Sequence, residues 1–199
     1  MTTPTPNKAE LPRISKNSKI KDKLEYLRNK GFYVFPLAHN KKSPPLVKEW
    51  QIPPTTDHKF NPANNIAIGG ILYKDPDDEL SLFVLDVDNK PEQPDRNGIP
   101  QYELLKEQYS LPDTYTVKTP NNGFHYYFYA NTDLLKTILP TVPNHPTKDN
   151  STDGIDIRTY KHFLVAPYST LTDGSSYTPI DPYAKIEKIP TAFIKSCQN

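Results

Sequence analysis

The sequence predicts an α+β fold, in which a mostly antiparallel sheet carries helices packed on it. Three observations lead to this prediction. Short apolar runs with strand character recur along the chain, and some are joined by turn residues typical of hairpins. Segments with helical periodicity lie before and between these runs. The chain of 199 residues has 22 prolines, more than twice the usual share of about 5%, which favours many short elements.

The first half of the chain contains one predicted helix and three predicted strands. Ser18 is expected to cap a helix that runs to about Lys30 and ends at Gly31. An irregular segment rich in Lys and Pro, residues 38–64, separates the first strand from the second. The predicted strands are residues 32–37, 65–71 and 80–88.

The second half begins with a predicted helix over residues 100–110. Two hairpins are then expected. The first has strands 114–119 and 124–129 around the turn Pro120-Asn121-Asn122-Gly123, and the second has strands 155–159 and 163–166. The remaining predictions are a helical or irregular stretch over 132–150 and a short helix near 190–196.

The length suits one sizeable core, with room for two small lobes on it. The apolar fraction of 35% is low, and part of the deficit lies in residues 1–18, which we predict to be a disordered arm. Residues 19–180 are then one folded domain. Residues 181–199 are expected to be a C-terminal tail, or a linker toward a further domain.

Charge and cysteine content narrow the class of protein. A net charge of +1 is weak for a nucleic-acid binder that acts alone, although basic residues cluster at 13–30 and at Lys41-Lys42. The one cysteine, Cys197, excludes an internal disulfide and a cysteine-rich zinc site. No segment approaches the roughly 20 apolar residues of a membrane span, and no apolar signal follows Met1, so a cytoplasmic setting without a membrane partner is expected.

The run from Leu82 to Asp88 holds the first candidate functional residues. Because side chains alternate between the faces of a strand, Asp86 and Asp88 share one face with Leu82 and Val84. Two carboxylates at this spacing can bind one or two hard divalent cations. Without a cation they repel, and one is expected to have a raised pKa. A strand that runs out into solvent and a structural calcium loop are the alternatives.

Two further strands carry polar residues in the same way. His125 follows a glycine turn and shares a face with Tyr127 and Tyr129, where it can donate to a phosphate. A histidine bonded to a neighbour in the core or at the edge is the alternative. Asp156 and Arg158 share a face, which suits a metal ligand beside a cation that holds a triphosphate. A surface ion pair is the alternative for them.

In their order and spacing these motifs resemble the bifunctional primase-polymerase domains of the archaeo-eukaryotic primase superfamily, over about residues 20–180. The family's first motif, an apolar strand ending in Asp-x-Asp or Asp-x-Glu, is matched by Asp86 and Asp88. Its second, a small residue, any residue and His, is matched by Gly123-Phe124-His125, and its third, an apolar residue and Asp, by Ile155-Asp156. Further positions whose sequence is similar to that of the family are 31–36, Lys42, Pro44, Trp50, 65–69, 119–123, 166–169, Gly174 and Tyr177.

This resemblance implies a sheet of the RNA-recognition-motif type that carries the acids, with a small packed αβ lobe closing over it. It implies a DNA primase or DNA polymerase that transfers nucleotides by a two-metal mechanism in the replication of a plasmid, virus or mobile element. Single-stranded DNA template, primer and NTP or dNTP are the implied partners. Family members are often fused to a helicase, so a helicase domain or partner is also implied.

The resemblance also implies residue roles. Asp86, Asp88 and Asp156 would hold two Mg²⁺ or Mn²⁺ ions and act as the catalytic acids. The implied nucleotide-binding residues are His125, Arg158, Lys42 and Gly123. Gly123 stands where Ser is common in the family, which removes one expected phosphate contact. Without a cysteine-based zinc module, the grip on the template must come from elsewhere in the molecule.

Two other classes remain as alternatives. One is a non-catalytic module that binds a replication origin or single-stranded DNA, but such a binder has no use for three acids facing a polyanion. The other is a sugar-nucleotide transferase that uses Asp-x-Asp to hold a metal diphosphate. That class usually needs a longer chain and a nucleotide-binding α/β half, which the sequence does not show.

Overall fold

A computed structural model describes residues 13–51, 58–72, 79–141, 146 and 154–198. It has the α+β architecture predicted from the sequence, with strands that are antiparallel except where β9 pairs with β5. The elements are α1 (Ile20–Asn29), β1 (Phe32–Leu37), β2 (Asn65–Leu72), β3 (Leu80–Val87), a 3₁₀ turn (Pro94–Arg96), α2 (Gly98–Tyr109), β4 (Thr116–Lys118), β5 (Phe124–Asn131), α3 (Thr132–Ile138), β6 (Ile155–Arg158), β7 (Phe163–Val165), β8 (Thr178–Pro179), β9 (Glu187–Lys188) and α4 (Thr191–Ser196).

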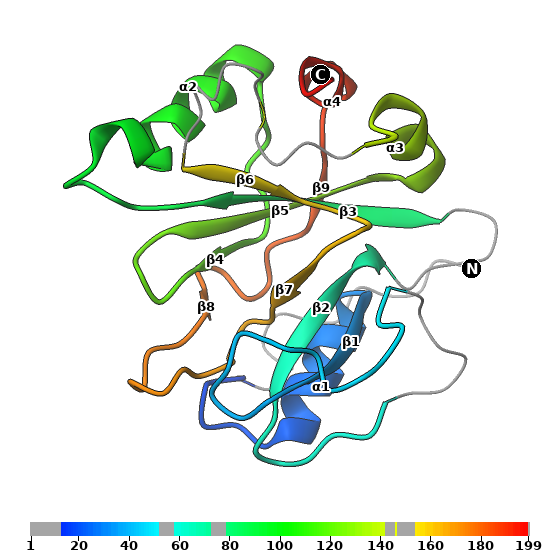
Figure 1. The fold of residues 1–199 in the computed structure, drawn as a ribbon, viewed down its shortest axis with the longest axis vertical. Helices are drawn as coiled ribbons and strands as arrows, with labels where there is room; N and C mark the ends of the chain where they lie inside the picture. Colours follow the sequence, from blue (N-terminus) through cyan, green and yellow to red (C-terminus); the bar gives the residue numbers. More distant parts are fainter. Residues whose placement is uncertain (1–12, 52–57, 73–78, 142–145, 147–153, 199) are drawn as a thin grey trace.

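The central sheet is of the RNA-recognition-motif type. The elements β3, α2, β4, β5, α3 and β6 follow one another as β-α-β-β-α-β, and β3 lies in the middle between β5 and β6. The strand β4 continues the sheet beyond β5, as the predicted hairpin requires. In Figure 1 the helices α2, α3 and α4 all lie on the same side of this sheet.

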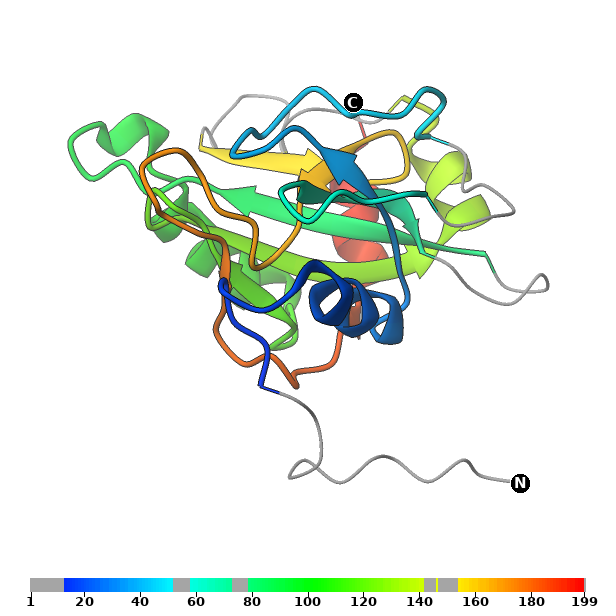
Figure 2. The same ribbon diagram turned by 90° about the horizontal axis from the view of Figure 1, so that it is seen from below.

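A smaller lobe covers the other face. It consists of α1, β1, β2 and β7, with β2 paired to β1 on one side and to β7 on the other. A single pairing, Ile71 with Ser81, joins β2 to the central sheet. Figure 2 shows α1 and β1 in front of the central strands. The expected αβ lobe is therefore present, but its third strand, β7, comes from the C-terminal half of the chain.

Alternation along β3 divides the core into two clusters. Leu82 and Val84 point toward the small lobe and pack in one apolar cluster with Leu24, Phe32 and Phe35. Phe83, Leu85 and Val87 point the other way, into a second cluster formed with the helices behind the sheet. Both faces of β3 are buried along most of its length, which is why its sequence is almost continuously apolar.

The predicted second hairpin is wrong. The strands β6 and β7 do not pair with each other; β6 pairs with β3 in the central sheet, and β7 pairs with β2 in the small lobe. The chain passes between the two sheets through a tight crossing at Thr159 and Gly70. A Cβ atom at Gly70 would lie 2.0 Å from the carbonyl oxygen of Thr159, so only glycine allows this approach.

The C-terminal segment is not a tail. Residues 181–198 include β9, which pairs with β5, and the expected short helix, α4. Ile189, Phe193, Ile194 and Cys197 are each at most 1% exposed, and they pack in the cluster behind the central sheet. The prediction failed because the segment is short and its apolar residues are few, so its burial depends on a groove that the rest of the fold provides.

At the other end, the helix α1 begins one residue later than predicted. Lys19 is its N-cap residue and makes no side-chain cap, while the Ser18 hydroxyl accepts a hydrogen bond from the Ser15 backbone amide instead. Of the arm predicted over 1–18, residues 1–12 lie outside the described part of the chain. Lys16 donates to the carbonyl oxygen of Gly174, 3.3 Å away. No helix among the described residues is long and apolar enough to cross a membrane.

Candidate functional site

The polar residues of three strands form one row across the central sheet. In the register of the sheet, Asp86 on β3 lies opposite His125 on β5 and also opposite Asp156 on β6. Directly opposite residues in an antiparallel pair have Cβ atoms about 4.5–5.5 Å apart, so their side chains can interact. The motifs that the sequence analysis found about 30 to 40 residues apart are thus neighbours, because β3 is the strand between the other two.

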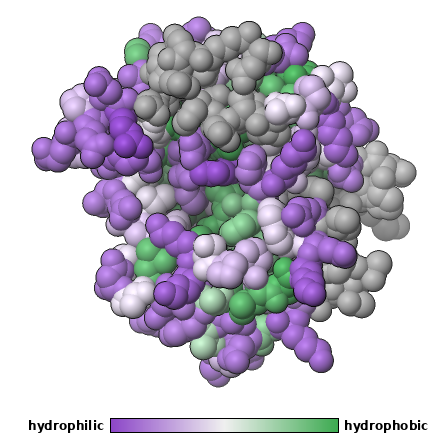
Figure 3. Space-filling model, viewed as in Figure 1, coloured by the Kyte–Doolittle hydropathy of each residue, from purple (hydrophilic) through white to green (hydrophobic). Residues whose placement is uncertain are grey.

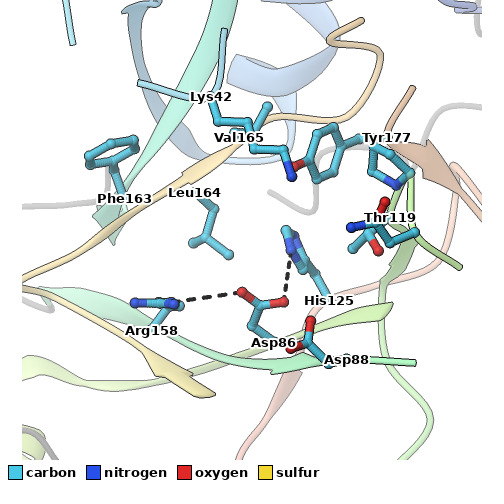
Figure 4. A pocket seen from close by; sticks show the side chains of 12 residues that line it. Lys42, Asp86, Asp88, Thr119, His125, Arg158, Phe163, Leu164, Val165 and Tyr177 are labelled. Carbon is cyan, nitrogen blue, oxygen red and sulfur yellow. Dashed lines mark ion pairs between the residues drawn. The ribbon is translucent and has the colours of Figure 1, made fainter. Parts of the chain in front are cut away.

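Asp86 is the centre of this row. Its carboxylate lies 3.2 Å from Nε2 of His125 and 3.8 Å from Nε of Arg158, as Figure 4 shows with dashed lines. Burial acts to raise the pKa of Asp86, but His125, Arg158 and Lys42 together lower it below its usual value. Asp86 is therefore ionised at neutral pH, and the raised carboxyl pKa predicted from like-charge repulsion is wrong for this residue.

The other two acids also have cationic neighbours. The Arg158 guanidinium donates to the Asp156 carboxylate at 2.5 Å, and the Lys90 ammonium donates to Asp88 at 2.5 Å. Lys90 had no role in the sequence analysis, although its position two residues after Asp88 was a signal available there. Each of the three carboxylates is thus accompanied by a basic side chain, which relieves their mutual repulsion.

A cavity opens above this corner of the sheet. Five of the predicted site residues line it: Asp86, Asp88, His125 and Arg158 from the central sheet, and Lys42 from the small lobe. Figure 4 shows Lys42 reaching toward the cavity from the side opposite the acids. The structure therefore brings Lys42, 44 residues before Asp86 in the chain, to the same site. Asp156 does not belong to the lining, since its side chain is turned toward Arg158.

Gly123 lies beside the site for a reason of packing. Its backbone is buried against the end of β3, and a Cβ atom there would lie 2.4 Å from the carbonyl oxygen of Val87. A side chain of any kind, serine included, would therefore force the turn away from the strand. The structure gives Gly123 no place in the cavity lining.

The other lining residues were not among the predicted site residues. Thr119, Pro120 and Asn121 belong to the turn between β4 and β5, where a family-like segment was the only signal. Tyr177 faces His125, with ring centroids 5.6 Å apart. The wall opposite the acids is β7 itself, through Phe163, Leu164 and Val165. The strand itself was predicted over 163–166, but its place at the site was not, because a short apolar strand gives no sign that it borders a cavity.

Two buried polar atoms beneath the cavity have no hydrogen-bond partner among the described residues: Nδ1 of His125 and the hydroxyl of Tyr127. His125 is 5% exposed, and its Nε2 faces Asp86. Buried polar groups are nearly always paired in folded proteins, and exceptions concentrate at functional sites. The predicted alternative, a histidine bonded to a neighbour, is correct for Nε2, while Nδ1 remains unexplained by packing.

The donor set suits a hard divalent cation in its chemistry. Carboxylate oxygens are the ligands that Mg²⁺ and Mn²⁺ prefer, and the backbone brings three of them to one corner of the sheet. The side chains, however, are turned toward basic partners. Within the described residues, no group of three or more His, Cys, Asp or Glu side chains is positioned to hold a metal ion. Asp86, Asp88 and Asp156 fit such an ion by residue type and strand position.

Comparison with known proteins gives one family. The family model Prim-Pol, described as "Bifunctional DNA primase/polymerase, N-terminal", matches residues 23–192. No curated protein matches the chain. Among solved structures, the chain is similar to the polymerase domain from Mycobacterium tuberculosis Ligase D in complex with DNA, with 12% sequence identity, a TM-score of 0.36, and coverage of 87% of this chain and 86% of that one.

Proposed function

Because the chain belongs to the bifunctional DNA primase/polymerase family, we propose that it catalyses template-directed nucleotidyl transfer, as a DNA primase, a DNA polymerase or both. One observation carries the proposal: Asp86 and Asp156 lie opposite each other on neighbouring strands, with Asp88 following, beside a cavity lined by basic residues. Acids at this position suit metal binding, and the basic residues suit a triphosphate.

In this proposal Asp86, Asp88 and Asp156 would hold two Mg²⁺ or Mn²⁺ ions. Such ions would lower the pKa of the attacking hydroxyl and neutralise the negative charge of the leaving pyrophosphate. Arg158, which pairs with Asp86 and Asp156 and also lines the cavity, is a basic group that would contact a triphosphate there. Arg158 presents a planar fork of donors, which matches phosphate oxygens in pairs.

The chain's own residues position the nucleotide. Lys42 approaches from the small lobe and Arg158 from the sheet, so the triphosphate is held from two sides. His125 lines the same cavity and would donate to the β- or γ-phosphate. The 3′-oxygen of the primer, or of the first nucleotide, bonds to the α-phosphorus. The bond from that phosphorus to the pyrophosphate oxygen breaks, and the hydroxyl proton passes to solvent.

The remaining parts of the proposal concern the setting. A single-stranded template, a primer and NTP or dNTP are the substrates, and a helicase domain or partner acts alongside. Replication of a plasmid, virus or mobile element is the proposed context. These points are supported by the family resemblance of the motifs.

The test is a labelled-nucleotide extension assay on single-stranded DNA, with and without a primer. We expect the chain to extend a primer in Mg²⁺ or Mn²⁺, and the double variant Asp86→Asn/Asp88→Asn to show only background. Asparagine is chosen because it keeps the shape next to His125 and Arg158 while removing the charge that a cation requires. Melting curves should show that the variant remains folded.

A matched control removes two acids from the far side of the sheet. Glu103 and Asp113 are exposed residues near the helix α2, and Glu103→Gln/Asp113→Asn makes the same change in net charge. This control should retain parental activity. A folded Asp86→Asn/Asp88→Asn variant that polymerises like the parent would overturn the mechanism. A parent that binds single-stranded DNA but transfers no nucleotide would favour the non-catalytic binding module.

A further inference from the structure

The cavity has two walls of different character. The acids, His125 and Arg158 form a charged wall on the central sheet, and the strand β7 forms an apolar wall through Phe163, Leu164 and Val165. Figure 3 shows an apolar hollow between the two halves of the molecule, with hydrophilic side chains around it. A triphosphate needs only the charged wall. The apolar wall fits a ligand that has an apolar part as well.

Phe163 is the aromatic ring of this wall. It is half-buried, lines the cavity, and in Figure 4 lies on the same side as Arg158. Two other rings pack against it: its centroid is 5.0 Å from that of Trp50 and 5.8 Å from that of Phe35, both edge-to-face. Trp50 is in turn stacked on the fully buried Phe35. A ring held in this way loses little further freedom when a ligand contacts it.

We propose that Phe163 is the surface on which the base of the incoming nucleotide stacks, with Trp50 and Phe35 as its support. This inference rests on the proposed function, because it takes the ligand of the charged wall to be a triphosphate. Stacking on an aromatic ring is open to every base, since each has a π-face. A surface of this kind holds any nucleotide and leaves the choice between bases to the template.

The other ring of the lining is less suited to this task. Tyr177 is 4% exposed, and its ring lies against His125 at 5.6 Å. In Figure 4 it lies on the opposite side of the cavity from Phe163, near Lys42. A base needs an accessible ring, and Phe163, which is half-buried, is more exposed than Tyr177. The triphosphate then lies between Tyr177 and Arg158, and the base extends toward Phe163.

The chain contains a natural reporter for this contact, because Trp50 is its single tryptophan. Binding is measured by isothermal titration calorimetry in Mg²⁺, with ATP and with inorganic tripolyphosphate, and Trp50 fluorescence is followed with excitation at the red edge of its absorption. We expect ATP to bind about tenfold more tightly than tripolyphosphate, a ratio that lies within the range of about five- to 150-fold for one stacked base. ATP should change the emission of Trp50, and tripolyphosphate should not.

Three variants test whether ATP binding depends on the aromatic ring at position 163. Phe163→Leu should weaken ATP binding about tenfold and leave tripolyphosphate binding unchanged, so that the two ligands bind alike. Phe163→Tyr keeps the ring and should keep the preference for ATP. Phe60→Leu is the matched control, because Phe60 is another half-buried ring of the small lobe and does not line the cavity.

The outcomes distinguish this inference from the proposed function. If both ligands bind the parent, and Phe163→Leu weakens both equally or weakens neither, the stacking surface is overturned while the triphosphate site stands. An effect of Phe163→Leu that appears only when template DNA is present would overturn it in favour of a contact with the template base. If neither ligand binds the folded parent, the proposed function fails, and the stacking surface fails with it.

Discussion

At the scale of single residues, Gly123 and Asp86 show how closely the site depends on the end of β3. Gly123 packs against the carbonyl oxygen of Val87 and near the backbone amide of Asn89, so the β4–β5 turn contacts the chain next to Asp86 and Asp88. Asp86 in turn is held by His125, which follows Gly123 after one residue. A displacement of the turn would therefore move His125 relative to Asp86.

This packing predicts the effect of a small substitution. Gly123→Ala should lower the free energy of unfolding by about 1–3 kcal/mol, because the added methyl group lies within contact distance of backbone atoms that cannot easily move. Gly123→Ser should be destabilised to a similar extent, and the hydroxyl should not improve nucleotide binding. Urea unfolding followed by circular dichroism measures the change. Asn121→Ala, an exposed residue of the same turn, is the control; equal stability of all three variants would show that the turn is free to shift.

At the scale of elements, the segment after residue 180 completes the sheet and its cover. The strand β9 adds a parallel partner to β5 beyond the end of β4. The helix α4 then places Phe193 between Phe83 of β3 and Tyr109 of α2, at centroid distances of 6.0 and 5.2 Å. Phe193 lies on the opposite face of β3 from Asp86, so its packing stabilises the strand that carries the acids without contributing to the cavity.

Phe193→Ala should therefore lower the free energy of unfolding by about 3–5 kcal/mol, the usual range for a fully buried phenylalanine. Removal of residues 190–199 should destabilise the chain at least as much. The measurement is the midpoint of chemical unfolding, with Lys195→Ala, an exposed position of the same helix, as the control. A truncated chain that unfolds at the parental midpoint would show that the C-terminal segment is a tail after all.

At the scale of the whole molecule, charge limits how tightly the chain can hold DNA. The net charge is +1, and part of the basic run at 13–30 is used inside the protein. Lys23 donates to the carbonyl oxygen of Tyr168, and Lys30 donates to that of Ala184 and lies 4.2 Å from the ring centroid of Tyr115. Burial lowers the pKa of both, that of Lys30 to about 8. Lys41 and Lys42, by contrast, are exposed.

We expect the chain to bind single-stranded DNA with a Kd of about 10⁻⁶ M or weaker at physiological salt, the usual scale of non-specific binding. Lys41→Ala/Lys42→Ala should reduce the slope of log K against log salt by about 0.7 for each phosphate that these lysines neutralise in the parent. The control pair Lys19→Ala/Lys21→Ala removes two exposed charges from the region of the helix α1 and should have a smaller effect. Fluorescence anisotropy over a salt series measures both, and nanomolar binding that persists at high salt would show that the fold gathers its charges into a groove.

Local patterns in the sequence were sufficient to predict most of the elements and the faces of the strands. The alternation in β3 and β6 placed Asp86 and Asp156 opposite apolar faces that are buried behind the sheet, and the alternation in β5 placed His125 on one face with Tyr127; the structure agrees with these assignments. This succeeds because strand alternation and glycine turns are local properties, which depend on backbone geometry within a few residues. The order and spacing of the three motifs also identified the family.

Which segments meet could be seen only in the folded chain. Strand pairing is a contact between residues far apart in the sequence, so β6 and β7 joined different sheets although they look like a hairpin. Long-range packing also brings Lys42 and Phe163 to the lining of the same cavity. It likewise buries the helix α4 in the core. The ion pairs of Asp86, Asp88 and Asp156 depend on side-chain positions that no spacing encodes. Local backbone geometry determines which side chains share one face of a strand. Long-range packing determines which other segments that face contacts.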